Sequence, residues 1–369
     1  MEHLIPDSDF APLAMFTLIA IGVGGLYILS VTADVLVESA TDLALRLGLP
    51  KVIIGATILS LGTTAPECAV SVLGAIDGDG GLALGNAVGS VIFDTAVIFG
   101  LLGLFAPLPA DRFILARQGW VQFGSAVLLA AACYLFYARD GLAASLPGWF
   151  GWLLLGLLAA YLVISVRWAK QHKALAAERS APPDATQDHH PEEVSDEIDE
   201  HGSDRPVWII LAIMVAALAG MLIAGRFVVG TAVEAATRLA IPEQVISATF
   251  VALGTSLPEL VVGLKAIRRG AGEILVGNVV GADILNVLFV AGASAVGAAA
   301  AGQPLEIVSP EAARPTVFLE VQLPMMLLSL LYFRVCIAKA SKTGRFDQWM
   351  GIPLLAIYAI GTAASFLLS

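Results

Sequence analysis

The chain has 369 residues, of which 58% are hydrophobic and only 14% are charged, and its mean hydropathy is +0.84. A soluble globular domain is about half apolar and about a quarter charged, so this composition argues against a soluble enzyme and excludes a disordered chain. The net charge at pH 7 is −11, and residues 168–205 contribute −6 of it through ten acidic and four basic residues. The acidity therefore belongs mainly to one loop and indicates no nucleic-acid partner.

Ten apolar runs are long enough to be membrane helices, each of which needs about 20 apolar residues. The sequence predicts an all-α membrane protein with ten transmembrane helices. A loop over 168–206, rich in proline, acidic residues and histidine, divides them into five and five, and we expect it to be a disordered linker. The predicted spans lie near 11–34, 51–76, 81–106, 118–138, 147–166, 207–233, 241–266, 273–297, 315–334 and 348–368.

The positive charges predict the orientation of these spans. If the linker is cytoplasmic, all but four of the 20 lysine and arginine residues lie in loops on its side, the exceptions being Arg139, Arg226, Arg238 and Arg314. Both termini are then expected outside. The first ten residues contain no lysine or arginine, so we expect the first apolar run to be a retained helix instead of a cleaved signal.

Two segments of the sequence repeat each other. Residues 60–94 match residues 252–286 without a gap at thirteen of thirty-five positions, and both contain G-T-x-x-P-E followed by G-N-x-V-G. Five spans separate the copies, so the second copy must run in the opposite direction through the membrane. Inverted repeats are typical of secondary transporters, with the binding site at the repeat interface near the midplane. The predicted units are two five-helix repeats, 1–167 with its motif at 55–99 and 207–369 with its motif at 247–291.

Acidic residues lie inside the apolar spans of both copies. Glu67 and Glu259 occupy matching positions, and Asp94 and Asp283 follow in the companion helices. A charge at mid-membrane costs roughly 2.5–3.5 kcal/mol or more, so such residues are functional candidates. The nearest lysine and arginine residues lie in the turns, so a proton or a bound cation has to supply the positive charge.

A proline precedes each glutamate and is expected to break the helix. Pro66 and Pro258 cannot donate a hydrogen bond to the carbonyls of Gly62 and Gly254, four residues earlier. Irregular backbone at membrane depth occurs where it lines a cavity or is buried in protein. Together with hydroxyl groups, the freed carbonyls and the carboxylates offer oxygen ligands of the kind that Ca²⁺ prefers. Those hydroxyls belong to Thr63, Thr64, Thr255 and Ser256.

Spacing of four residues predicts that several of these side chains share one helix face. The pairs are Thr63 with Glu67, Ser90 with Asp94, Thr255 with Glu259, and Ala282 with Asn286. Asp283 lies one step off that face.

The motifs GTTAPE and GTSLPE, with GNAVGSVIFD and GNVVGADILN, resemble the α-repeats of the cation/Ca²⁺ exchanger superfamily, particularly those of prokaryotic sodium/calcium exchangers. The resemblance implies that Glu67 and Glu259 are the central Ca²⁺ ligands. It implies that the first and sixth spans slide, that a single chain is a working unit, and that there is no resident cofactor. It also implies that Ca²⁺ and Na⁺ sites are lined by Ser60, Thr63, Thr64, Ala252, Thr255, Ser256, Ser90, Asp94 and Asn286.

Three departures from the family pattern leave the coupling ion open between Na⁺ and H⁺. Ala282 lacks the usual serine hydroxyl, the acid of the Asp94 and Asn286 pair lies in the first copy, and Asp283 stands where asparagine is common. The main hypothesis is a Ca²⁺ antiporter of a prokaryotic plasma membrane, and the alternative is an H⁺-coupled antiporter of Ca²⁺ or another divalent cation. A channel, with flux that needs no counter-ion, is one rival. An intramembrane aspartyl protease is another, although its YD and G-x-G-D motifs are missing from the sequence.

Overall fold

The computed structural model describes residues 10, 12–180, 205–239, 256–308 and 317–368. In the first half, the helices and strands are α1 (Met15–Leu47), α2 (Lys51–Ile54), η1 (Gly55–Leu59), α3 (Ser60–Thr63), α4 (Ala65–Ile76), α5 (Gly80–Ile92), η2 (Phe93–Phe99), α6 (Gly100–Phe105), β1 (Leu108–Pro109), α7 (Ile114–Asp140), η3 (Gly141–Ala143), β2 (Ser145–Leu146) and α8 (Gly148–Ser180). The second half contains α9 (Val207–Arg238), α12 (Leu257–Arg268), α13 (Gly272–Leu285), η5 (Asn286–Ala291), α14 (Gly292–Ala300), β3 (Leu305–Glu306), η6 (Phe318–Gln322), α15 (Leu323–Thr343), β4 (Arg345–Phe346), η7 (Gln348–Met350) and α16 (Gly351–Leu368).

The helices confirm a multi-pass membrane protein. Within the described residues, seven helices are long and apolar enough to cross a membrane. An eighth span results if 51–63 and 65–76, which meet at an angle of 44°, are taken as one broken helix. Of the other two predicted spans, 241–266 lies partly outside the described residues, and 348–368 corresponds to the shorter helix α16.

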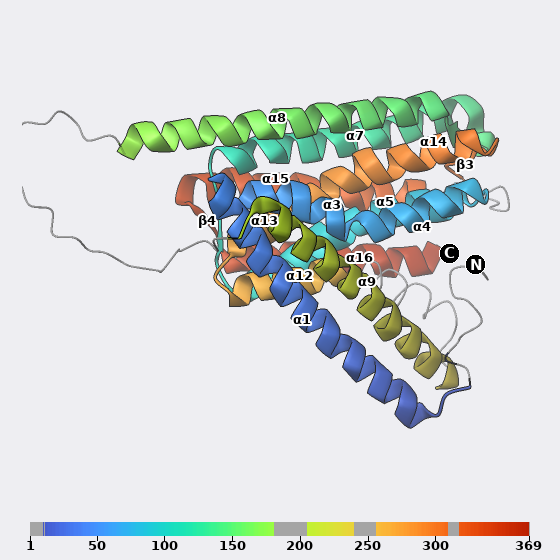
Figure 1. Ribbon diagram of the computed structural model, residues 1–369. Helices are drawn as coiled ribbons and strands as arrows, with labels where there is room; N and C mark the ends of the chain where they lie inside the picture. Colours follow the sequence, from blue (N-terminus) through green and yellow to red (C-terminus); the bar gives the residue numbers. More distant parts are fainter. Residues whose placement is uncertain (1–9, 11, 181–204, 240–255, 309–316, 369) are drawn as a thin grey trace, which may run out of the picture.

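Two short strand pairs relate the halves of the molecule. β1, which follows the third predicted span, pairs antiparallel with β4, and β2 pairs antiparallel with β3, which follows the eighth. Exchanging the two halves therefore exchanges the two pairs. Figure 1 shows β4 and β3 at opposite ends of the helical body. This is the arrangement that two repeats of opposite orientation would produce.

The two segments that flank the linker lie at one end of this body. In Figure 1 the end of α8 and the start of α9 are on the β4 side, whereas the start of α1 and the end of α16 are towards the β3 side. One boundary of the predicted linker was wrong, because α8 continues to Ser180 and residues 168–180 are helical. A helix can extend beyond the membrane into water where its sequence favours it, so the end of an apolar run does not mark the end of the helix. Residues 181–204 lie outside the described part of the chain.

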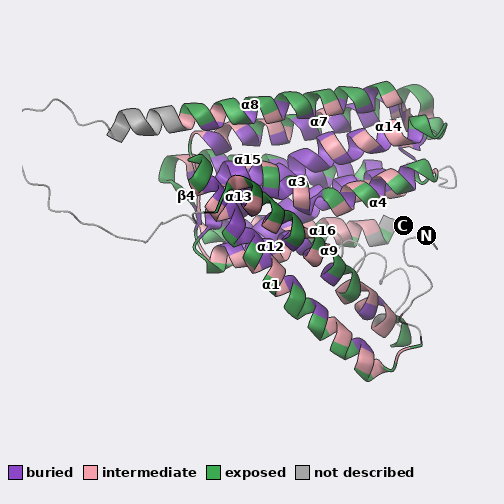
Figure 2. Cartoon of the chain, viewed as in Figure 1, coloured by how far each residue is buried: buried purple, intermediate pink, exposed green. Residues whose placement is uncertain are grey.

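The centre of the molecule is formed by α13, η5 and α14. Every residue of α13 except Glu273 is buried, and the helix packs against α2, η1, α3, η2 and α7. Figure 2 shows this buried centre, with much more exposed surface on α8, α1 and α9. A polar group on α13 is therefore withdrawn from both water and lipid.

Helices α1 and α9 form a pair that extends away from the rest of the protein (Figure 1). Glycines allow their close approach: a Cβ atom on Gly25 would come within 2.9 Å of Val228, and one on Gly220 within 2.9 Å of Thr32. Close packing at small residues is the usual way in which helices associate in membranes.

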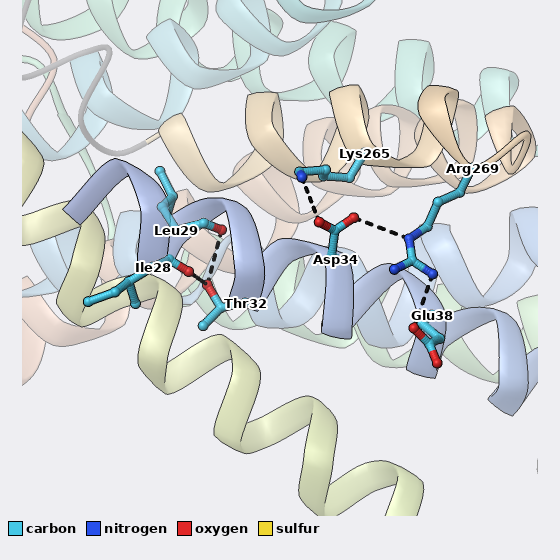
Figure 3. Close-up of polar contacts among 7 residues, drawn as sticks. All are labelled: Ile28, Leu29, Thr32, Asp34, Glu38, Lys265 and Arg269. Atoms are coloured by element: carbon cyan, nitrogen blue, oxygen red, sulfur yellow. Dashed lines mark hydrogen bonds and ion pairs between the residues drawn. The ribbon is translucent and has the colours of Figure 1, made fainter. Parts of the chain in front are cut away.

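Ion pairs fasten this helix pair to α12. Lys265 Nζ lies 2.6 Å from Asp34 Oδ2, and Arg269 bridges Asp34 and Glu38 at 3.2 and 3.1 Å (Figure 3). Lys265 was expected in a turn, but it lies within α12. It forms an ion pair with Asp34 of α1 and not with the acidic residues of the repeat.

Candidate functional site

The first copy of the repeat contains a broken helix, as its proline predicts. α3 ends at Thr63 and α4 begins at Ala65, so Pro66 lies in the first turn of α4, where a missing N–H is tolerated best. Glu67 lies in the same turn and is buried. The equivalent helix α12 begins at Leu257, just before Pro258, and Glu259 is buried in its first turn.

The companion helices change to π-helical geometry at the site. In the first copy this change begins at Phe93, next to Asp94, and in the second copy it begins at Asn286. A third π-helical segment, η1, ends immediately before Ser60. Such segments are rare and frequently mark functional sites. The sequence pattern predicted helices here but not this local geometry.

The two glutamates face a common interior region. The Glu259 carboxylate interacts electrostatically with Glu67 and Asp94, and the Thr63 hydroxyl lies close to it. Atom Oε2 of each glutamate is buried without a hydrogen-bond partner among the described residues. Buried carboxylate oxygens need a partner, so these two atoms are available to a cation or a proton.

Thr63 lies beside residues of the other repeat. It is separated from Glu67 by the break at Thr64, so the two residues lie in two helices that meet at 44°. Thr63 lies close to Glu259, and its hydroxyl is 3.4 Å from Asn278 Oδ1. A periodicity argument holds only within an unbroken helix.

The unequal pair Asp94 and Asn286 also joins the two repeats. Asn286 Nδ2 donates to Asp94 Oδ2 at 3.4 Å, and both residues are buried. Asp94 Oδ1 and Asn286 Oδ1 have no partner in the described structure. Each companion helix thus contributes one side-chain oxygen without a described partner, and the two side chains that carry these oxygens are in contact.

Two donors fix the side chain of Asp283. The Thr95 hydroxyl and the Gln122 amide both donate to its Oδ2, the latter at 2.6 Å. Asp283 also interacts electrostatically with Asp94, so it lies at the border of the same region. Gln122 comes from α7, which the sequence analysis did not connect with the site. The only available signal was an amide within an apolar span.

Two asparagines of the repeat were identified as identical positions but not as candidate site residues. Asn86 Nδ2 donates to Ser71 Oγ at 2.9 Å and to the backbone carbonyl of Glu67 at 3.3 Å. It therefore fixes the turn that carries Glu67. Asn278 is buried beside Thr63. The G-N pair shared by both copies was the signal that could have identified them.

The other predicted site residues are either buried hydroxyl-bearing side chains or lie outside the described part of the chain. Ser60, Thr64, Ser90 and Ser256 are buried, and the hydroxyls of Thr64 and Ser256 have no partner within the described chain. Ser60 bonds back to the carbonyl of Thr57 at 3.2 Å. Ala252 and Thr255 lie outside the described residues.

The acidic groups do not form a compact cluster. Among the described residues, no three histidine, cysteine, aspartate or glutamate side chains are arranged to hold a metal ion by themselves. A cation here would take hydroxyl, amide and backbone oxygens in addition to carboxylates, a mixture that suits hard cations.

Comparison with known proteins decides the family. The family described as "Sodium/calcium exchanger protein" matches residues 17–167 and again residues 209–367. The chain belongs to the sodium/calcium exchanger family. It is therefore a membrane transporter of the cation/Ca²⁺ antiporter class, not an enzyme, which leaves no room for the protease alternative.

Relatives of this exchanger extend over most of its length. It is 31% identical to the inner membrane protein YrbG of Escherichia coli over 324 residues, which cover 87% of this chain and 89% of that protein. It is 28% identical to the sodium/calcium exchanger MaX1 of Methanosarcina acetivorans, over 90% of this chain and 94% of the relative. A solved structure of the sodium-calcium exchanger NCX_Mj, soaked with Na⁺ and Sr²⁺, is similar with a TM-score of 0.70 at 25% identity, covering 94% of this chain and 97% of that one.

Proposed function

We propose that this exchanger moves Ca²⁺ against Na⁺ by alternating access at a site between two inverted five-helix repeats. Glu67 and Glu259 bind Ca²⁺, and the same region binds Na⁺ once Ca²⁺ has left. The observation that carries this proposal is the pair of buried glutamates, one from each repeat, each with an unpaired oxygen. The names of the relatives MaX1 and NCX_Mj support the choice of ions.

Competition at one site explains obligatory exchange. The site carries several carboxylates, and no described lysine or arginine forms an ion pair with Glu67, Glu259, Asp94 or Asp283. An empty site would therefore have to carry its charges through an apolar barrier, which is unfavourable. Bound Ca²⁺ or Na⁺ neutralises part of that charge, so the loaded forms change sides more readily than the empty one.

The proposal includes the ten-span topology. The repeats 1–167 and 207–369 cross a prokaryotic inner membrane in opposite directions, with both termini outside and the linker in the cytoplasm. The strand pairs at opposite ends of the body support the inversion, and the side on which α8 ends and α9 begins supports a linker opposite the termini.

Transport by reconstituted protein tests the function. Proteoliposomes loaded with Na⁺ are expected to take up Ca²⁺, and Glu67→Gln or Glu259→Gln should lower the rate by about a hundredfold or more. Removing one partner of a buried charged set costs about 3–5 kcal/mol, and every 1.4 kcal/mol is tenfold. Glu306→Gln is a matched control, because Glu306 lies in β3 at the end of the body.

Proton coupling is the second candidate. Asp94 and Asp283 are buried acids beyond the two glutamates, and Ala282 offers no hydroxyl to a Na⁺ ion. Vesicles carrying only a pH gradient separate the two mechanisms. Ca²⁺ uptake there, without uptake in Na⁺-loaded vesicles, would replace Na⁺ by H⁺. Uptake without any counter-ion would contradict exchange and indicate a channel.

A further inference from the structure

One face of α7 carries a stripe of buried polar side chains. Gln118, Gln122 and Ser125 are spaced by four and three residues and are all buried, although α7 is one of the membrane-spanning helices. Unpaired amides at membrane depth are costly, so each needs a partner inside the protein. Gln118 Nε2 donates to Tyr161, whose hydroxyl donates to the carbonyl of Ala56 in η1. Gln122 has a different partner.

Gln122 and Thr95 converge on one oxygen of Asp283. They come from α7 and η2, and both donate to Oδ2 on α13, leaving Oδ1 as a buried oxygen without a described partner. Two donors on one carboxylate oxygen hold the side chain in one orientation. The hydrogen bonds thereby fix the position of Oδ1 at the border of the site, where the Asp283 carboxylate interacts electrostatically with Asp94.

This arrangement occurs in one half of the molecule only. The position in the first copy that matches Asp283 is Val91, which is buried among apolar side chains. The second repeat therefore carries one more acid than the first at this position. Two glutamates balance the charge of one Ca²⁺ ion, which leaves Asp94 and Asp283 as two further buried carboxylates that need a proton or a cation beside them.

We propose that Asp283 binds the coupling Na⁺ ion through Oδ1, and that Gln122 and Thr95 are positioning residues that hold Asp283 for this purpose. This inference rests on the proposed sodium/calcium exchange and adds a named ligand for Na⁺. It follows that loss of either donor weakens Na⁺ dependence and leaves the Ca²⁺ position, formed around Glu67 and Glu259, largely intact.

Two transport curves test the proposal. Ca²⁺ uptake is measured in proteoliposomes against internal Na⁺ and against external Ca²⁺, for the wild type, Gln122→Met, Thr95→Val and Asp283→Asn. Each variant is expected to need about tenfold more Na⁺ for half-maximal uptake, with the half-saturating Ca²⁺ concentration changed less than about twofold. Gln122→Met in the Asp283→Asn background should add nothing, because Gln122 acts through Asp283.

A matched control comes from the same face of α7. Gln118→Met removes an equally buried amide that does not contact Asp283, so Na⁺ dependence should stay at the wild-type value. If Gln118→Met and Gln122→Met behave alike, the effect is general packing and the proposal is wrong. It is also wrong if Ca²⁺ affinity falls while Na⁺ dependence is unchanged.

Equilibrium binding can be measured even for variants that no longer transport Ca²⁺. Displacement of radioactive Ca²⁺ by Na⁺ from purified protein in detergent should require about tenfold more Na⁺ for Gln122→Met and Thr95→Val. Unchanged displacement would overturn the proposal. Absence of Na⁺-driven uptake by the wild type is a separate outcome, since it refutes sodium/calcium exchange before any variant is compared, and the Na⁺ assignment is refuted with it.

Discussion

Glycines determine how closely α13 approaches the broken helix of the first copy. A Cβ atom on Gly277 would lie 2.3 Å from the backbone oxygen of Val52, and one on Gly281 would lie 2.5 Å from the Cα atom of Ala56. Both neighbours are backbone atoms, which cannot move aside as a flexible side chain can. These contacts bring α13 against α2 and η1, the segments that lead to Ser60 and Thr63.

This close contact makes Gly277→Ala a residue-scale prediction. The variant should lower the free energy of unfolding by about 1–3 kcal/mol, the usual cost of overpacking, or force α13 away from α2. Thermal unfolding of purified protein in detergent measures the first effect, and Ca²⁺ transport reports the second. Gly156→Ala on α8 is the control, because no described atom lies within 4 Å of its Cβ position. Equal stability of the two variants would contradict the packing argument.

At the scale of elements, the α1 and α9 pair is joined to the body partly through charges. Asp34 lies on α1, and its partners Lys265 and Arg269 lie in and just after α12, the helix that begins with Glu259 (Figure 3). A movement of α1 along α12 would have to break these ion pairs. The side chain of Lys265 is only 12% exposed, so water screens its charge less than at an open surface.

A double-mutant cycle tests this ion pair. Asp34→Asn and Lys265→Met should each destabilise the protein, and the double variant should be less destabilised than the sum by about 1 kcal/mol. That value is the upper end for partly exposed pairs. Thermal unfolding of the four proteins measures the coupling. Simple additivity would show that the pair contributes nothing to holding α1 on α12.

At the scale of the whole molecule, the proposed topology places the two strand pairs on opposite sides of the membrane. Gln303 precedes β3, and Lys342 precedes β4 at the opposite end of the body (Figure 1). The proposed inversion of the repeats requires these two ends to face different compartments.

Labelling of single cysteines checks this arrangement. In a variant lacking Cys68, Cys133 and Cys336, a membrane-impermeant maleimide added outside intact cells should label Gln303→Cys and leave Lys342→Cys unlabelled. Everted vesicles should give the reverse result. Labelling of both positions from the same side would refute the proposed topology.

The sequence by itself determined the class of the protein, the repeat and its acidic residues. Apolar runs of about 20 residues can hardly be anything but membrane spans, and a proline beside Glu67 breaks a helix whatever surrounds it. These are local properties of the chain, so they can be predicted without any knowledge of the fold. The prediction that the linker begins at residue 168 was wrong, because hydropathy indicates which residues lie in the membrane and not where a helix ends.

Only the tertiary structure decided which side chains meet. Thr63 contacts Glu259 of the other repeat, and Gln122 contacts Asp283 from a helix outside the repeat motif. The π-helical segments beside Asp94 and Asn286 are likewise invisible to a pattern with a period of 3.6 residues. Contacts between residues more than a hundred positions apart depend on how helices pack, and spacing along one helix carries no information about the neighbour it will face.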